Sequence, residues 1–474
     1  MKNLLSKKIP LVFASALICT TPFAFTSCGS SDAIQLANFE SYMDDDLMDY
    51  LTEKYDVQYQ WYTVAEMIET KFEKVYDIAI PCGYEVVALY KRGWLEKINW
   101  GKFGLKNPIT AELIDTTDEV MNLIAEPVRI AISEMNESFR TYLEDNSFNI
   151  LDYAVPYFAQ SFMFAYKGNK LDFYKYGTNE ITDKPTWTDI FYTISPANEN
   201  LDPRFNQSVT GRTGMLDDAK SLYDISRIIE TTINGSDPFA ATNKMPKDST
   251  VDDLINTFNY LSDNFKKKKG SWFALNTDSG IISRNLADHK YGYEAALTWS
   301  GDALYSALGA EEFEPYTGEQ IRIQRPYGTS LDEIDFVVMN NKNDKDPTRL
   351  DRIYKVVYDI CLDGVFAAPT KDGIGAEEDG HYKYWSMQNW DRVNYTPIWK
   401  SIYDYVVDEQ SDYWDYVFED KGWTDQQIQS AKQLYASIVA FPDQEYAHSL
   451  FGRALTPLEN SNTHWAWLQT RGKL

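Results

Sequence analysis

Short apolar runs alternate with helix-like stretches at the start of the chain. The pattern predicts strands at residues 34–37, 57–61 and 76–80. It predicts helices at residues 44–54 and 63–74, the second opened by a capping pair, Thr63 and Glu66. Alternation of this kind predicts a parallel sheet with helices packed on its faces.

Ligands of such sheets sit beyond the carboxyl ends of the strands. Residues 38–42 and 81–84 are predicted loops at two of these ends, so we expect both to face one crevice. The strand pattern restarts later in the chain, at residues 153–166, 295–299 and 336–339. Further helices are expected after Asp217-Asp218 and around residues 254–261.

The N-terminus has the order of a secretory signal. Lys2, Lys7 and Lys8 precede an apolar stretch that is too short for a membrane-spanning helix and ends before Ser27-Cys28. A small residue before a cysteine at this place is similar to a bacterial lipobox, in which the cysteine is lipidated. We therefore predict a lipoprotein signal peptide at residues 1–27 and a flexible tether at 28–32. The alternative is an ordinary signal peptide that happens to contain Cys28.

The net charge indicates which partners to expect, and the cysteines indicate buried thiols. The formal net charge of −26 disfavours nucleic acid, whose backbone needs protein cations, and it suits a cationic ligand. Simple solubility would explain the same charge. Cys82 and Cys361, the two cysteines beyond the N-terminal region, are expected to be buried thiols.

Motifs for catalysis are missing from the sequence. The four histidines have no metal-ligand spacing, and no nucleophile elbow or phosphate loop is present. We therefore expect no catalytic residues, no metal site and no cofactor. Paired carboxylates for glycoside hydrolysis stay open as an alternative, because their pairing is spatial.

Aromatic residues gather in predicted loops and at strand ends. A polyamine is a string of ammonium groups on methylenes, and aromatic faces and carboxylates bind both parts. The aromatic candidates for such a site are Phe39, Tyr42, Tyr84, Trp299 and Tyr395. Each of them could instead be a packed core aromatic.

Several motifs occur in the order found in one known family. They are Asn38-Phe39-Glu40-Ser41-Tyr42, Tyr76-Asp77-Ile78-Ala79-Ile80-Pro81-Cys82-Gly83-Tyr84, Tyr153-Ala154-Val155-Pro156-Tyr157, Pro185-Thr186-Trp187-Thr188-Asp189, Asp217-Asp218-Ala219, Trp299-Ser300-Gly301 and Asn394-Tyr395-Thr396-Pro397. In these motifs the chain resembles the spermidine/putrescine-binding components of bacterial ABC importers, in the divergent form found as mollicute lipoproteins. The likeness spans most of the chain after the signal.

The resemblance implies ligand-binding roles at matching positions. It adds Cys82, which replaces a serine, and Asp218, which matches an amine-binding aspartate, to the aromatic candidates. Asp218 could equally be the N-cap of the helix that follows it. Asp335 is favoured as a further carboxylate because it directly precedes the predicted strand 336–339. The family's next glutamate is replaced by Ser221, and its C-terminal glutamine has no counterpart.

The resemblance also implies the fold. We expect an α/β protein of the two-lobed, type II periplasmic-binding-protein class, each lobe a mainly parallel sheet flanked by helices. Lobe 1 would take residues 33–155 plus about 337–395, and lobe 2 would take 156–336 plus about 396–474. The crossing segments near Val155 and Val338 would act as the hinge.

The expected function follows from that fold and from the candidate residues. We expect a monomeric lipoprotein, anchored through Cys28 on the outer face of the cell membrane, that captures a polyamine and delivers it to an ABC importer's permease. No nucleic acid is expected as a partner. One alternative is an oligosaccharide ligand, which aromatic platforms would also fit. Another is a surface lipoprotein or enzyme that keeps only the fold.

Overall fold

The computed structural model describes most of the chain. The described residues are 32–62, 65–205, 213–235, 250–265, 273–288, 292–309, 321–374, 382–418, 423–443, 445–452 and 455–473. The predicted signal peptide at 1–27, the lipidation site Cys28 and the capping residue Thr63 lie outside these ranges.

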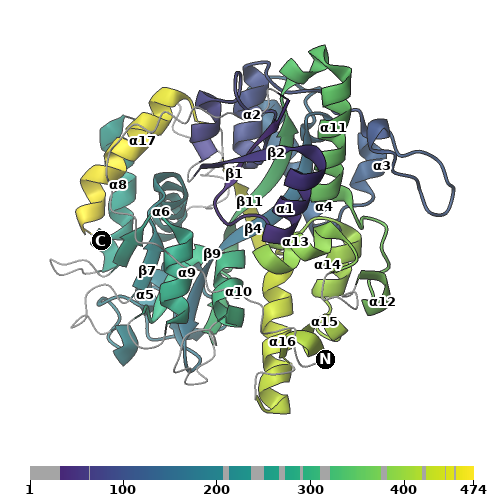
Figure 1. Ribbon diagram of the computed structural model, residues 1–474. Coiled ribbons are helices and arrows are strands. Elements are labelled where there is room, and N and C mark those ends of the chain that lie inside the picture. The colour runs from purple at the N-terminus through teal and green to yellow at the C-terminus, as the bar shows by residue number, and fades with distance from the viewer. Residues whose placement is uncertain are drawn as a thin grey trace, which may run out of the picture.

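One mixed sheet runs through the molecule, in the spatial order β2-β1-β3-β11-β4-β9-β7-β8. Its strands are β1 (Ile34–Phe39), β2 (Val57–Tyr62), β3 (Ile78–Ala79), β4 (Ala154–Lys167), β7 (Thr213–Leu216), β8 (Phe273–Asn276), β9 (Ala295–Trp299) and β11 (Gly328–Met339). Pairing is parallel from β2 to β3 and from β9 to β8, and antiparallel from β3 through β11 and β4 to β9. Two parallel units are therefore joined by an antiparallel centre (Figure 1).

The two central strands belong to both halves of the molecule. Residues 154–161 of β4 pair with β11, and residues 162–166 pair with β9. All residues of β4 are buried. A strand that is covered on both faces needs such a continuous buried run. Shorter strands extend the sheet: β10 (Ile321–Gln324) and β12 (Thr396–Pro397) pair with β4, and β13 (Ala447–Phe451) pairs with β11.

The first parallel unit is built from β1, β2 and β3 with helices around it (Figure 1). These helices are α1 (Asp45–Tyr55), α2 (Gly83–Lys91), α3 (Thr117–Met121), α4 (Glu126–Leu143) and α11 (Pro347–Val357), which continues into a π-helical turn, Tyr358–Leu362. The Oδ1 atom of Asp44 accepts a 3.0 Å hydrogen bond from Leu47 N and so caps α1. The helix ends at Asp56 in the left-handed region, with φ 56°.

The second parallel unit contains β7, β8 and β9. Its helices are α5 (Trp187–Thr193), α6 (Ala219–Ile233), α8 (Val251–Phe258), α9 (Ser279–Ala287), α10 (Ser300–Gly309) and α17 (Pro457–Thr470). A small hairpin, β5 (Phe173–Tyr174) with β6 (Ile181–Thr182), lies beside α5. The C-terminal helix α17 packs on α6 and α8, with the ring of Trp467 5.2 Å from that of Phe258.

Several helices follow the crossing strands in sequence. They are α12 (Lys371–Ile374), α13 (Trp385–Val393), α14 (Lys400–Val406), α15 (Asp412–Phe418) and α16 (Asp425–Val439). Backbone hydrogen bonds from Ala125 N to Ile398 O (3.0 Å) and from Lys400 N to Leu123 O (2.9 Å) join the start of α14 to the first unit. The exact lobe limits stay a prediction.

Some predicted elements differ from those observed. The helix expected at 63–74 is instead a 3₁₀ helix, Ala65–Thr70, followed by turns. Ile68 and Phe72 are buried there while Met67 is exposed, which is too little apolar surface to sustain a longer helix. The last central strand is also longer than predicted. It begins at Gly328, so Asp335 lies inside β11 and does not precede it.

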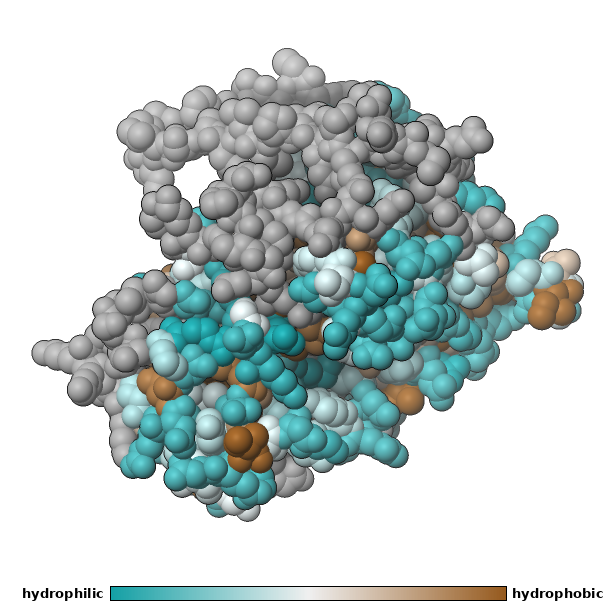
Figure 2. Space-filling view, turned by 90° about the horizontal axis from the view of Figure 1, so that it is seen from below, coloured by the Kyte–Doolittle hydropathy of each residue, from teal (hydrophilic) through white to brown (hydrophobic). Residues whose placement is uncertain are grey.

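The face seen in Figure 2 is mostly hydrophilic over the described residues, and its apolar residues are scattered singly. Isolated exposed apolar side chains are ordinary on a protein surface. Within the described ranges, no helix combines the length and the apolar character that crossing a membrane requires.

The Tyr157 hydroxyl on β4 forms hydrogen bonds with the segment after β1 and with α13. It donates to Tyr42 O at 2.7 Å and accepts from Asn389 Nδ2 at 2.8 Å. Tyr157→Phe removes the acceptor of Asn389 Nδ2 and leaves Tyr42 O with only the 3.2 Å hydrogen bond from Asn38 Nδ2, so we expect the free energy of unfolding to fall by about 1–3 kcal/mol in urea titrations. The exposed Tyr305→Phe is the matched control and should change nothing measurable. Equal stability of the two variants would contradict the structural role of this hydroxyl.

Candidate functional site

A bulge in β4, where Tyr157 and Phe158 lie opposite the single β11 residue Asp335, marks the junction of the two halves. The pairing register with β4 shifts between Ile334 and Phe336, opposite Pro156, which has no N–H to donate to the ladder. Phe336 N bonds to Pro81 O at 2.9 Å instead, and Asp335 forms an isolated bridge with Cys82. The bulge thus brings the Asp335 carboxylate against the loop that follows β3.

The Asp335 carboxylate is fully buried and only partly satisfied. Its Oδ2 atom accepts hydrogen bonds from the Tyr42 hydroxyl at 2.6 Å and from Gln160 Nε2 at 3.0 Å. Its Oδ1 atom has no hydrogen-bond partner among the described residues. Burial raises the pKa of Asp335 to about 6, against the opposing effect of Tyr42 and of the neighbouring Cys82 thiol. One acceptor atom of a costly buried carboxylate is therefore left for another donor.

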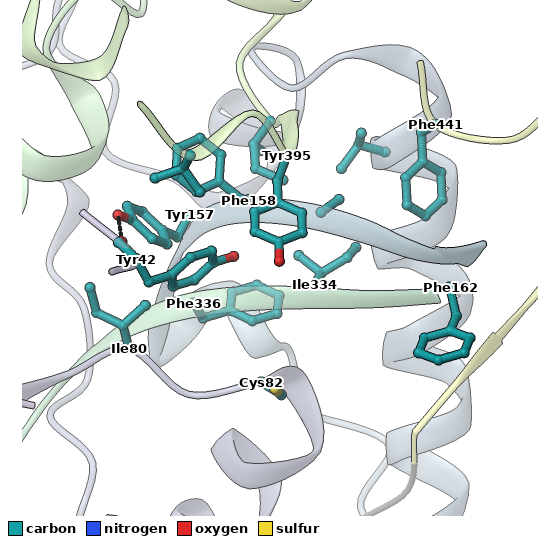
Figure 3. Packing of buried hydrophobic residues seen from close by; sticks show 14 of the residues in the cluster. Tyr42, Ile80, Cys82, Tyr157, Phe158, Phe162, Ile334, Phe336, Tyr395 and Phe441 are labelled. Atoms are coloured by element: carbon teal, nitrogen blue, oxygen red, sulfur yellow. Dashed lines mark hydrogen bonds between the residues drawn. The ribbon is translucent and has the colours of Figure 1, made fainter. Parts of the chain in front are cut away.

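Aromatic rings surround this carboxylate. The ring of Tyr42 lies 5.3 Å from that of Tyr395 and 5.4 Å from that of Tyr157, both edge to face. In Figure 3 the hydroxyl ends of Tyr42 and Tyr395 point toward the same space, beside the crossing strands. Phe39, the last residue of β1 and not part of a loop as predicted, packs on Tyr42 and on Tyr62. Four of the predicted residues thus gather here: Tyr42, Cys82, Asp335 and Tyr395.

A second carboxylate, half-buried, lies on the other side of Tyr395. The Tyr395 hydroxyl donates to Asp302 in α10, and Thr298 Oγ1 lies 3.4 Å from Asp302 Oδ2. Burial raises the pKa of Asp302 to about 6. Gly301 permits this approach, because a Cβ there would overlap the Tyr395 ring. Asp302 was not among the residues predicted from the sequence, although it directly follows the motif Trp299-Ser300-Gly301.

A third carboxylate in this region is buried and is already paired with a lysine. Glu333 on β11 lies 3.3 Å from Lys220 Nζ, which is also 3.8 Å from the centre of the Tyr84 ring. Burial raises the pKa of Glu333 to about 7, although Lys220 opposes the rise. The carboxylates around Lys220 raise its own pKa. Tyr84 lies in the first turn of α2 and not in a loop, and Lys220 carried no sequence signal beyond its place after Asp218.

Asp218 and Trp299 lie at the edge of this group. Asp218 is the N-cap of α6, and its oxygens accept from Lys220 N at 3.3 Å, from Ser221 N at 3.1 Å and from the Ser221 hydroxyl. The capping alternative is therefore present in the structure. Trp299 ends β9 and packs edge to face on Phe162 at 5.1 Å. Within the described residues, no hydrogen bond or ion pair joins either residue to Asp335.

Cys82 is a buried thiol beside the Asp335 carboxylate. It occupies the N-cap position of α2 without a capping hydrogen bond. Burial, Asp335 and Glu333 together raise its pKa well above the usual range. The thiol is thus protonated and lines the site without nucleophilic character. Within the described residues, no three His, Cys, Asp or Glu side chains gather as metal ligands.

A known protein family matches most of this chain. The family model described as hypothetical lipoprotein (MG045 family) matches residues 5–440. The chain belongs to the MG045 lipoprotein family. No curated protein matches it in sequence.

Solved structures share the fold of this MG045-family protein. The spermidine/putrescine ABC transporter substrate-binding protein of Streptococcus pneumoniae is 14% identical with a TM-score of 0.50, over 93% of this chain and 99% of that one. A lipoprotein of Treponema pallidum is 13% identical, TM-score 0.47, over 93% and 99%. Thiaminase I of Bacillus thiaminolyticus is 12% identical, TM-score 0.49, over 93% and 99%. The predicted type II periplasmic-binding-protein class is confirmed.

The raised pKa of Asp335 makes the pH dependence of stability predictable. The folded protein keeps this proton to a higher pH than the unfolded chain does, so ionisation of Asp335 lowers stability as the pH rises from 4 to 6. Above pH 6 the cost is about 3 kcal/mol. Asp335→Asn removes that cost and keeps an oxygen for Tyr42 and Gln160. In urea titrations, the free energy of unfolding of Asp335→Asn relative to that of the wild type should be larger at pH 8 than at pH 5. A variant less stable than wild type by the same amount at both pH values would contradict this.

Proposed function

We propose that this MG045-family lipoprotein captures a small organic cation of the polyamine class outside the cell and delivers it to an ABC importer. The supporting observation is the Asp335 carboxylate, which is fully buried between the two halves with one oxygen unbonded among the described residues and with tyrosines around it.

The chemistry of the site favours a cation over a neutral ligand. Asp335 has no ion-pair partner within the described part of the chain and keeps one oxygen unbonded there, whereas Asp302 is hydrogen-bonded by Tyr395 and Thr298. A buried carboxylate without a cation costs free energy, and a ligand ammonium would offset that cost through charge-assisted hydrogen bonds. The faces of Tyr42 and Tyr395 would contact its methylenes. A sugar site would have less reason to bury the Asp335 carboxylate.

The fold supplies a means of capture and release. β4 and β11 connect the two halves, so a small change in these strands would open or close the space around Asp335. Solved structures of this fold include a protein named as the substrate-binding component of a spermidine/putrescine ABC transporter. We infer the same division of labour here: a monomer that binds without catalysis and a permease that transports.

Membrane attachment would come from the N-terminus. The family is described as a lipoprotein family, and Ser27-Cys28 follows the apolar stretch of the signal. Cys28→Ala should move the protein from the membrane fraction to the soluble fraction, as fractionation and immunoblotting would show. If the variant still partitions into detergent, the anchor is elsewhere in the chain.

Binding of the ligand should depend on the charge of Asp335. In calorimetry at pH 7.5, putrescine, spermidine or spermine should bind the wild type. Asp335→Asn should weaken binding about tenfold to a hundredfold, because one buried charge-assisted hydrogen bond contributes roughly 1.5–3 kcal/mol. Affinity should also fall from pH 7 to pH 5, as Asp335 takes up a proton and loses its charge.

Asp118→Asn is the matched control for this measurement. Asp118 is an exposed carboxylate in the first turn of α3, so its loss should leave affinity unchanged. Asp218→Asn tests the predicted ligand role of that residue separately from its capping role. No heat with any of the three polyamines, together with clear heat from a sugar, would show that the ligand class is wrong.

A further inference from the structure

Lys220 occupies a place suited to the ammonium group of a ligand. Its Nζ atom faces the Tyr84 ring at 3.8 Å and the Glu333 carboxylate at 3.3 Å. An aromatic face and a carboxylate are the two partners that an organic ammonium prefers. The chain therefore places its own cation where a second ligand charge would bind.

The surroundings hold Lys220 in this position. It is the second residue of α6 and is buried, as are Glu333 and Tyr84. Gly452 N donates to the same oxygen, Glu333 Oε1, at 3.0 Å. A Cβ at Gly452 would overlap both Lys220 Nζ and Glu333 Oε1. The backbone at Gly452 thus lies close against both charged groups.

This lysine lies next to the proposed ligand site. Glu333 and Asp335 are two residues apart on β11, next to the point where its pairing register with β4 shifts. The carboxylates interact with each other, and the Cys82 thiol interacts with Asp335, Glu333 and Lys220. Asp335 and Glu333 are therefore neighbouring buried carboxylates. Each has one oxygen without a hydrogen bond among the described residues, but only Glu333 is paired with a cation, Lys220.

The other carboxylates near Lys220 are Asp218 and Asp224, and both help to raise the pKa of the lysine. Asp218 is two residues before Lys220, and its oxygens accept hydrogen bonds from the first turn of α6. Ser221 brings no charge. A second ligand ammonium near Lys220 would meet the lysine's positive charge at close range.

We propose that Lys220 is a specificity-determining residue that fills a second ammonium subsite at Glu333 and Tyr84, so that the protein selects amines held through one ammonium at Asp335. This inference rests on the proposed function. Under it, additional ammonium groups of a polyamine gain nothing in the wild-type site. Short amines and long polyamines then bind with similar affinity.

Lys220→Met tests this by vacating the subsite while keeping an apolar stem over Tyr84. Calorimetry at pH 8, where the Glu333 carboxylate is ionised when a cation faces it, should use n-butylamine, putrescine and spermidine as probes. In the wild type the three affinities should agree within about threefold. In Lys220→Met, putrescine and spermidine should gain about tenfold to a hundredfold, from one added charge-assisted hydrogen bond. The affinity for n-butylamine should stay the same.

Two control variants separate this effect from a loss of structure. The double variant Lys220→Met with Glu333→Gln removes the carboxylate, so the gain for diamines should disappear. Lys432→Met removes another buried, ion-paired lysine, which pairs with Asp415 far along the chain, and should not alter any affinity. Circular dichroism of each variant establishes that it is folded.

Three results would overturn the inference. One is a wild type that already binds spermidine more than tenfold tighter than n-butylamine. Another is a folded Lys220→Met variant without the diamine gain. The third is a gain that persists when Glu333 is also changed. Failure of every amine to bind both the wild type and Lys220→Met, with heat from a sugar, would overturn the proposed function as well.

Discussion

The antiparallel pairing of β4 with β11 is the contact on which the rest of the structure depends. These buried strands connect two parallel α/β units, and their ladder is interrupted opposite Pro156, a residue that cannot donate a backbone hydrogen bond. The resulting bulge directs Asp335 toward the loops that follow β1 and β3. The same few residues therefore form the link between the halves and the centre of the proposed site.

The site keeps charge where the fold would be more stable without it. Burial raises the pKa of Asp302 and Asp335 to about 6 and that of Glu333 to about 7. A core of apolar residues would avoid this cost. Glu333 is compensated from within the chain by Lys220, whereas Asp335 has no ion-pair partner among the described residues. Since Lys220 neutralises Glu333, the charge of the proposed ligand would be set by the carboxylate that lacks a lysine, Asp335.

Local sequence patterns predicted several of the strands correctly. Alternating apolar runs located β1, β2 and β9 within one or two residues, and the capping position of Asp218 was foreseen as an alternative. The ordered motifs made Tyr42, Cys82 and Tyr395 candidates, and Asp335 was favoured for its place before a predicted strand. The structure gathers those four. Asp302 and Lys220 were not found. Their roles arise from the approach of Gly301 to Tyr395 and of α6 to β11, and such contacts between distant segments leave no local pattern in a sequence.

The central claim is that a cation binds at the Asp335 carboxylate, and proton release tests it most directly. Because this carboxyl has a pKa of about 6, a cation that binds it at pH 6 must displace a fraction of a proton. Calorimetry with putrescine at pH 6, in buffers of different ionisation enthalpy, measures that release. We predict a release near half a proton in the wild type and none in Asp335→Asn. Binding without any dependence on the buffer, or no binding at all, would contradict the account.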